Sequence, residues 1–386
     1  MSAHFDDDDL TSVAHEIVSI PSVSKNEGAA AERFVERMSE RGFSCHIDDA
    51  GNPVGVIGEG PQTIALVGHI DTVPGQPEVR IQDGVLHGRG SVDAKGPLVT
   101  FAAAARRAVD AGAAARFVVV GCVEEEVASS KGARHLAATW TTPPDALIIG
   151  EPSSSTGVTL GYKGYLRAQM TITTPSAHGA HEAASAPELA SDAWTALRDR
   201  ARAFAGEGAP LFDQVMPRLL AIQSGHDGLT DEATLQLALR LPLELSPEEA
   251  SVWLSDAGLW GNGEPMEDAR RKMQIEVTGG MPAWRGPRTS APARALSRAI
   301  LARGERPRFQ VKSGTADLNV LAPHWGCPAV AYGPGDAALD HTPEERIPLA
   351  ELHAGAAILT DALVSLSRQG QDDPETSPGT SAASSA

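Results

Sequence analysis

The sequence has few cysteines and a shortage of positive charge. Its three cysteines, Cys45, Cys122 and Cys327, are odd in number and widely separated. Such a set supplies neither a disulfide framework nor a CxxC metal site, so we expect a reducing compartment, namely the cytoplasm. The 32 Lys and Arg against 50 Asp and Glu give a formal net charge of −18. This balance argues against sequence-independent binding to nucleic acid, which needs a basic surface.

Long apolar runs are also absent. The runs at residues 117–120 and 146–149 are among the longest, and they are far too short to span a bilayer. The N-terminus begins Met-Ser-Ala-His-Phe followed by four aspartates, which lacks both the basic start and the apolar stretch of a secretory signal. We therefore expect no membrane association.

An α/β sheet is indicated by short apolar runs that alternate with helical segments. The runs at 63–68, 117–123 and 146–150 each lead into a polar cluster. Between the first two lies an alanine-rich segment, 97–112, with Pro at its start and Gly at its end, which predicts a helix. Strands that alternate with helices are typical of an α/β sheet.

The pattern changes after Tyr162. Residues 165–173 alternate like a half-exposed antiparallel strand. Further segments predict a helix at 187–204, strands at 219–223 and 234–241, a helix at 246–259 and a strand at 273–277. This order of strand, helix, strand, strand, helix, strand predicts a small inserted α+β domain.

After the insertion the helix–strand alternation returns. It predicts helices at 291–303 and 349–367 and strands at 320–322 and 329–332. We therefore assign 2–161 and 284–367 to one discontinuous α/β domain and 162–283 to the insertion. Residues 368–386 are Ser, Gly, Pro and Ala with a few acids, so we expect a disordered tail.

Candidate metal ligands follow the apolar runs in five clusters. They are His69 beside Asp71, Asp93 between glycines, the triplet Glu124–Glu126, Glu151 and His341. The carboxyl ends of strands meet at one edge of an α/β sheet, and imidazole with carboxylates is a ligand set for zinc and similar ions. Each cluster alone has an ordinary alternative as a surface pair, a solvated acidic face or a turn residue.

Taken in order, six stretches resemble the M20 family of co-catalytic metallo-hydrolases, which includes acetylornithine deacetylase, succinyl-diaminopimelate desuccinylase and carboxypeptidase G2-like enzymes. The stretches are GHIDTVPG (68–75), GRGSVDAKGPL (88–98), VEEEVASSKGA (123–133), IIGEPS (148–153), KSGTADLNVLAP (312–323) and DHTPEERI (340–347). The resemblance covers most of residues 10–367. It implies a mixed-sheet, zinc-peptidase-like catalytic domain with an inserted α+β domain that serves as a lid and in dimerisation.

The resemblance also implies how two divalent ions are held. His69 and Glu151 would bind one ion, Glu126 and His341 the other, and Asp93 would bridge them. Zinc is the default for this ligand set, and cobalt or manganese could occupy the same site.

Other roles follow from the same resemblance. Asp71 would orient the His69 ring, and Glu125 would act as the general base. The family commonly has Asp before this glutamate pair, where this chain has Glu124. The working pair could thus be Glu124–Glu125, but the spacing to residues 130–133 favours Glu125–Glu126.

The inserted domain of the family usually supplies a histidine that stabilises the transition state, reaching the partner subunit's site across a dimer. The candidates are His178 and His181, and the family spacing favours His178. For substrate recognition, Ser313, Gly314 and Thr315 offer backbone amides to a carboxylate. Asp317 and Asn319 are candidates for a substrate amine, and Lys163 and Arg285 are further candidates, each with an alternative as a surface ion-pair partner.

The stretches EEEVASSKGA and KSGTADLNVL are most similar to the branch of the family that releases lysine from an amino-group carrier protein. This implies a homodimeric amidohydrolase that frees lysine, or ornithine, from the C-terminal glutamate of a small acidic carrier in lysine or arginine biosynthesis. One alternative is a deacetylase or desuccinylase of a small free substrate. Another is a non-catalytic binding protein on the same fold.

Overall fold

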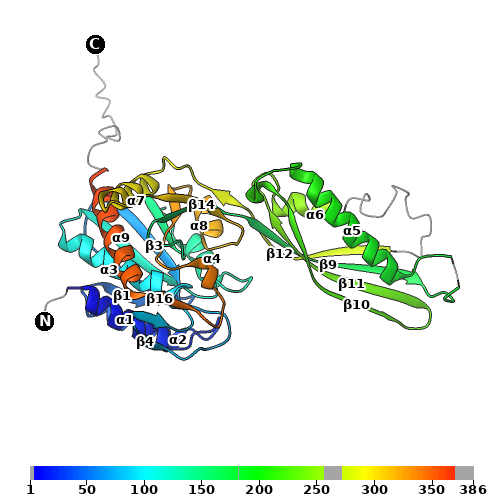
Figure 1. Cartoon of the computed structure of the whole chain (residues 1–386), viewed down its shortest axis with the longest axis horizontal. Coiled ribbons are helices and arrows are strands. Elements are labelled where there is room, and N and C mark those ends of the chain that lie inside the picture. The colour runs from blue at the N-terminus through cyan, green and yellow to red at the C-terminus, as the bar shows by residue number, and fades with distance from the viewer. Residues whose placement is uncertain (1–3, 181, 256–271, 370–386) are drawn as a thin grey trace, which may run out of the picture. The chain divides into compact units, whose positions relative to one another are not determined.

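The computed structural model describes residues 4–180, 182–255 and 272–369. The chain folds into two compact units (Figure 1). The first comprises Met1–Leu160, Gly286–Gln310 and His324–Ala386, and the second comprises Gly161–Arg285 and Val311–Pro323. Residues 311–323, which we expect from the sequence to lie in the catalytic domain, group with the second unit. Most of the expected tail, 370–386, lies outside the described residues.

A mixed sheet forms the centre of the first unit. Seven strands of this nine-stranded sheet pair in the order β1 (Ser44–Ile47), β2 (Pro53–Ile57), β6 (Ala115–Cys122), β3 (Gln62–His69), β7 (Ala146–Gly150), β15 (Ala329–Ala331) and β8 (Gly157–Tyr162). Strand β3 is parallel to β6 and to β7, with His69 opposite Cys122 and Gly68 opposite Gly150. The carboxyl ends of these three strands therefore share one edge of the sheet.

Helices cover this sheet. They are α1 (Asp7–Ser19), α2 (Gly28–Ser39), α3 (Lys95–Asp110), α4 (Lys131–Thr139), α7 (Ala291–Ala302) and α9 (Leu349–Gln369). Helix α3 lies close to the strands because they carry glycine where it packs: a Cβ on Gly150 would stand 3.0 Å from the Phe101 ring. Helix α9 is apolar and long enough to cross a membrane by length and composition, but it packs against α3 and α7 with Leu352, Leu359 and Leu363 fully buried. It is a core helix of this unit.

The second unit contains an antiparallel sheet in the order β10-β11-β9-β12. Its elements along the chain are β9 (Gly164–Pro175), α5 (Ala186–Ala205), the short 3-10 helix η1 (Leu211–Asp213), β10 (Met216–His226), β11 (Thr230–Leu241), α6 (Pro247–Ser255) and β12 (Lys272–Met281). Figure 1 shows α5 and α6 on this sheet, whose apolar face they cover. The βαββαβ order predicted from the sequence is confirmed.

Several short elements differ from the sequence prediction. Residues 320–322 lie in helix α8 (Leu318–Trp325) and do not form the predicted strand, because Val320 and Leu321 donate to the Asp317 carbonyl in helical turns. The remaining elements are β13 (Trp284–Arg285), β14 (Arg308–Lys312), η3 (Ala337–Leu339), and a small sheet of β4 (Arg80–Gln82), β5 (Val85–His87) and β16 (Arg346–Pro348). In this small sheet Arg346 lies opposite His87, so the chain after His341 runs beside the chain that leads to Asp93.

Candidate metal centre

The ends of the parallel strands hold most of the proposed ligands. His69 is the last residue of β3, Glu151 follows β7 directly, and Glu126 lies in the loop after β6. Asp93 precedes α3, and His341 lies in the segment that leads to β16. The parallel register at this edge explains why residues so far apart in sequence converge here.

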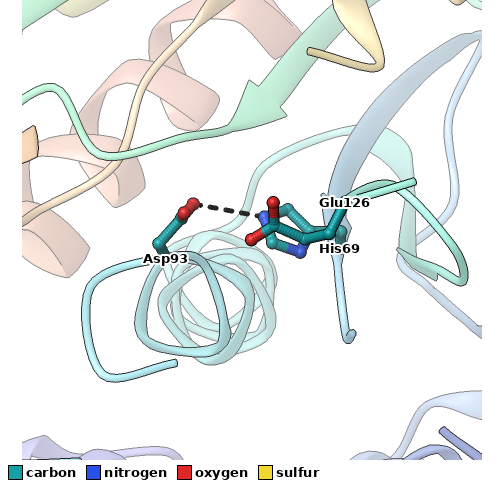
Figure 2. A group of neighbouring side chains, drawn as sticks. All are labelled: His69, Asp93 and Glu126. Atoms are coloured by element: carbon teal, nitrogen blue, oxygen red, sulfur yellow. Dashed lines mark hydrogen bonds and ion pairs between the residues drawn. The ribbon is translucent and has the colours of Figure 1, made fainter. Parts of the chain in front are cut away.

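Three of these side chains, His69, Asp93 and Glu126, lie together in one cluster (Figure 2), and the half-exposed His341 side chain contacts two of them. Single ligand atoms of His69, Asp93 and Glu126 all lie within 4.8 Å of one another. The His341 Nε2 atom is 2.9 Å from Asp93 Oδ2 and 3.0 Å from Glu126 Oε1. The His69 Nε2 atom is 3.3 Å from Asp93 Oδ1 and 4.0 Å from Glu151 Oε1. Asp93 thus contacts both imidazoles, His69 through Oδ1 and His341 through Oδ2.

The electrostatics of the cluster suit a divalent cation. In the described part of the chain, the ion-pair partners of Asp93 and Glu126 are imidazoles and not Lys or Arg. Hydrogen bonds with Asp93 and Glu126 raise the pKa of His341 to about 10. Burial acts to raise the pKa of Asp93, but its hydrogen bonds with His341 and His69 outweigh burial and hold that pKa below the ordinary range. A divalent ion would replace these imidazolium protons, because metal binding requires deprotonated ligands.

Asp71 supports both His69 and the glutamate loop. The His69 Nδ1 atom lies 3.0 Å from the Asp71 carbonyl oxygen and 3.5 Å from its Oδ1. The Asp71 carboxylate also accepts the backbone N–H groups of Glu125 and Glu126, both at 3.1 Å, and the Ser24 hydroxyl at 2.7 Å. A proton on Nδ1 leaves Nε2, which faces Asp93, as the electron-pair donor.

The three consecutive glutamates have different surroundings. Glu124 has a left-handed backbone (φ 58°), its N–H donates to Glu27, and its carboxylate accepts the Ser129 hydroxyl at 2.6 Å. Glu126 contacts His341, and the charge of Glu125 acts on His69. These contacts favour Glu125–Glu126 over Glu124–Glu125 as the working pair.

Two proposed substrate-binding residues are occupied by structural contacts within the second unit. The Lys163 ammonium is fully buried and donates to the carbonyls of Leu211, Phe212 and Gln214, which uses its three protons. Burial lowers the pKa of Lys163 to about 8. The Asn319 amide donates to the carbonyls of Lys163 and Pro282. These contacts favour structural roles for Lys163 and Asn319.

The other candidates of the second unit lie in different environments. Ser313 is exposed, Gly314 and Thr315 are half-buried, and Asp317 is buried. The Arg285 guanidinium lies 6.0 Å from the centre of the Phe212 ring. His178 is an exposed loop residue whose Nδ1 accepts the Ala180 N–H at 3.2 Å, and His181 lies outside the described residues.

Arg240 is a candidate anion-binding residue that the sequence alone does not indicate. This guanidinium is half-buried on β11, and its Nη1 donates to the Thr315 hydroxyl at 3.3 Å. Among the described residues, no carboxylate pairs with the Arg240 guanidinium. Burial, and to a smaller extent the positive charge of the neighbouring Arg167, lowers the pKa of Arg240. Its place on the polar side of an alternating strand does not distinguish it in sequence from a surface arginine. A desolvated cation beside a hydroxyl is suited to bind an anion.

The chain is similar to known proteins over most of its length. The model of peptidase family M20/M25/M40 matches residues 65–365. The chain is 46% identical over 356 residues to the [LysW]-lysine hydrolase of Deinococcus radiodurans. The aligned region covers 90% of this chain and 94% of that protein.

Solved structures of low sequence identity share the fold. The M20 family metallo-carboxypeptidase Sso-CP2 of Sulfolobus solfataricus has a TM-score of 0.74 at 16% identity, covering 93% of this chain and 99% of its own. A dinuclear metal-binding M20 peptidase of Bacillus subtilis has a TM-score of 0.67 at 12% identity, covering 93% and 97%. The fold class and the metal-dependent hydrolase class predicted from the sequence are confirmed.

The glutamate loop yields a test of its register. If Glu125 is the general base and binds no metal, Glu125→Gln is expected to keep both metal ions and to lower kcat by about 10²–10⁴-fold. If Glu126 is a metal ligand, Glu126→Gln is expected to lose one ion. Metal content by mass spectrometry and steady-state kinetics measure the two effects. An inactive Glu124→Gln enzyme with full metal content, together with a metal-depleted Glu125→Gln, would place the pair one residue earlier.

Proposed function

The chain belongs to peptidase family M20/M25/M40, and we propose that it hydrolyses the amide that joins lysine, or ornithine, to the C-terminal glutamate of the carrier protein LysW. The observation that carries this proposal is the 46% identity to a [LysW]-lysine hydrolase over nearly the full length of both chains. A deacylase of a small free substrate is the alternative within the family. A non-catalytic protein on this fold is disfavoured, because all five candidate ligands are present and clustered.

We propose that His69 and Glu151 hold one divalent ion, that Glu126 and His341 hold the other, and that Asp93 bridges them. Their distances and the mixed imidazole and carboxylate donors support this division. Zinc suits such donors best, and cobalt is an alternative.

Bound divalent ions would polarise the scissile carbonyl and lower the pKa of an attacking water. Glu125 would take the proton of that water and return it to the leaving amine. Asp71 keeps this glutamate in place through its backbone N–H and orients His69. Reaching across the proposed dimer, His178 or His181 of one subunit would stabilise the negative charge that develops on the carbonyl oxygen at the site of the other.

The substrate comparison tests the proposed function directly. Lysine release from lysine-loaded LysW is expected to be efficient. Hydrolysis of free acetylornithine to ornithine, or of succinyl-diaminopimelate to diaminopimelate, is expected to be slow. Amino-acid analysis of the product measures both, with Glu125→Gln as the inactive control. Efficient turnover of the free substrates with no activity on the loaded carrier would reject LysW and leave the amidohydrolase assignment in place.

Arg240 and Thr315 are proposed to bind a carboxylate of the substrate. Arg240→Met is expected to raise KM by about 10–100-fold, the usual size of a lost charge-assisted hydrogen bond, with a smaller effect on kcat. Arg298→Met is the control, because Arg298 is an exposed arginine on helix α7. An unchanged KM in Arg240→Met would contradict this role.

The second unit is proposed to carry the contacts of a homodimer. Strand β10 is an edge strand, and its Leu220 and Ile222 are 47% and 51% exposed. Edge strands with exposed apolar side chains invite pairing with another chain. Sedimentation equilibrium is expected to give a dimer for the wild type and a monomer for Ile222→Asp. Leu301→Asp, at an exposed position of α7, is expected to remain dimeric; a wild-type monomer would refute the proposal.

A further inference from the structure

A buried Arg89–Glu345 pair joins two segments that lie about 250 residues apart in the chain, 88–93 and 341–345. The two residues are 5% and 1% exposed. Glu345 Oε1 accepts the backbone N–H groups of Gly90, Val92 and Asp93 at 2.8, 3.0 and 3.1 Å. Its Oε2 accepts Arg89 Nη1 at 2.6 Å. One carboxylate therefore fixes the backbone that carries Asp93.

The same pair reaches the backbone of His341. Arg89 Nη2 donates to the His341 carbonyl at 3.4 Å, and its Nε donates to the Gly75 carbonyl at 3.2 Å. His341 has a left-handed backbone (φ 61°), which is unfavourable for a residue with a Cβ and must be held by its surroundings. We call Arg89 and Glu345 the clasp.

The clasp and Asp71 divide the support of the cluster between them. Asp71 contacts His69 and the backbone of Glu126, whereas the clasp contacts the backbones of Asp93 and His341. Two of the three ligands proposed for one ion thus depend on the clasp. At the other proposed ion site, formed by His69, Glu151 and Asp93, Asp93 is the one ligand whose backbone the clasp contacts.

We propose that Glu345 is a positioning residue: through Arg89 it sets the separation of Asp93 and His341 and thereby controls the affinity of the ion site formed by Asp93, Glu126 and His341. This inference rests on the ligand set of the proposed function. It requires no contact between Glu345 and the substrate or the ions. The predicted effect is selective for one of two ions, because the other ion depends mainly on contacts outside the clasp.

Glu345→Gln tests the clasp with almost no change in volume. Its amide oxygen can still accept the three backbone N–H groups, but its NH2 group then faces the Arg89 donors. The full-length protein loaded with Co2+ is challenged stepwise with a chelator while its visible absorption is recorded. One of two ions is expected to be released about 10–100-fold more readily, the usual effect of losing an outer hydrogen-bond partner, and its absorption band is expected to shift.

Arg89→Lys provides a second variant in case Glu345→Gln does not fold. It keeps a positive charge beside Glu345 but loses the planar fork that also reaches the His341 carbonyl, so the same ion should be weakened. Asp9→Asn is the control: it breaks the ion pair of Asp9 with Arg41, away from the clasp. It is expected to lower Tm without changing chelator release or the spectrum.

The outcomes separate the two proposals. A wild-type protein that binds fewer than two ions would reject the ligand set and the proposed function. Two ions in the wild type, with affinities and spectra unchanged in both clasp variants, would overturn the clasp and leave the function standing. Equal weakening of both ions would also overturn it, because the inference requires a selective effect.

Discussion

Acidic side chains repel one another, and burial makes that repulsion stronger because little water screens it. The cluster around Asp93 nevertheless brings Glu126 and Glu151 to the same buried edge of the sheet. Three parallel strands, β3, β6 and β7, impose this closeness through their shared register. The folded state is therefore stable only if positive charge offsets the repulsion between these carboxylates. Protonated imidazoles or bound cations supply that positive charge.

Four carboxylates in and around the cluster, those of Asp71, Asp93, Glu126 and Glu345, fall into two kinds according to what their oxygens contact. Those of Asp71 and Glu345 accept backbone N–H groups together with a serine hydroxyl or an arginine. Those of Asp93 and Glu126 meet imidazoles. The oxygens of Asp71 and Glu345 are already used by hydrogen bonds and have little capacity left for a cation. At Asp93 and Glu126, a metal ion can replace the proton of the neighbouring imidazolium. This difference in hydrogen-bond satisfaction separates supporting residues from candidate ligands.

The sequence was sufficient to predict the strands that end at the cluster, because each combines a strongly apolar run with an abrupt polar cluster. It was insufficient for β4, β5 and β16, since three-residue strands contain too little periodicity to detect. Glu345 sits in an acidic stretch that is also typical of a helix start, and nothing local marks it as buried. Lys163 and Asn319 have suitable chemistry for substrate binding, but their burial and carbonyl partners depend on tertiary packing. The candidate ligands were predictable because their chemistry and their strand ends coincide.

The second unit is built from two separate stretches, and residues 311–323 complete it only after residues 286–310, which belong to the first unit, have followed its main stretch, 161–285. During translation, residues 161–285 are therefore synthesised first. The second unit can be completed only after residues 286–310 and then 311–323 have been synthesised. The first unit waits longer, because α9 at residues 349–369 covers its core helices. Neither unit can finish folding during early synthesis, so the order of translation makes this chain depend on late, long-range contacts. A stop codon between α3 and α9 would leave the apolar surface of α3 that α9 covers exposed to aggregation.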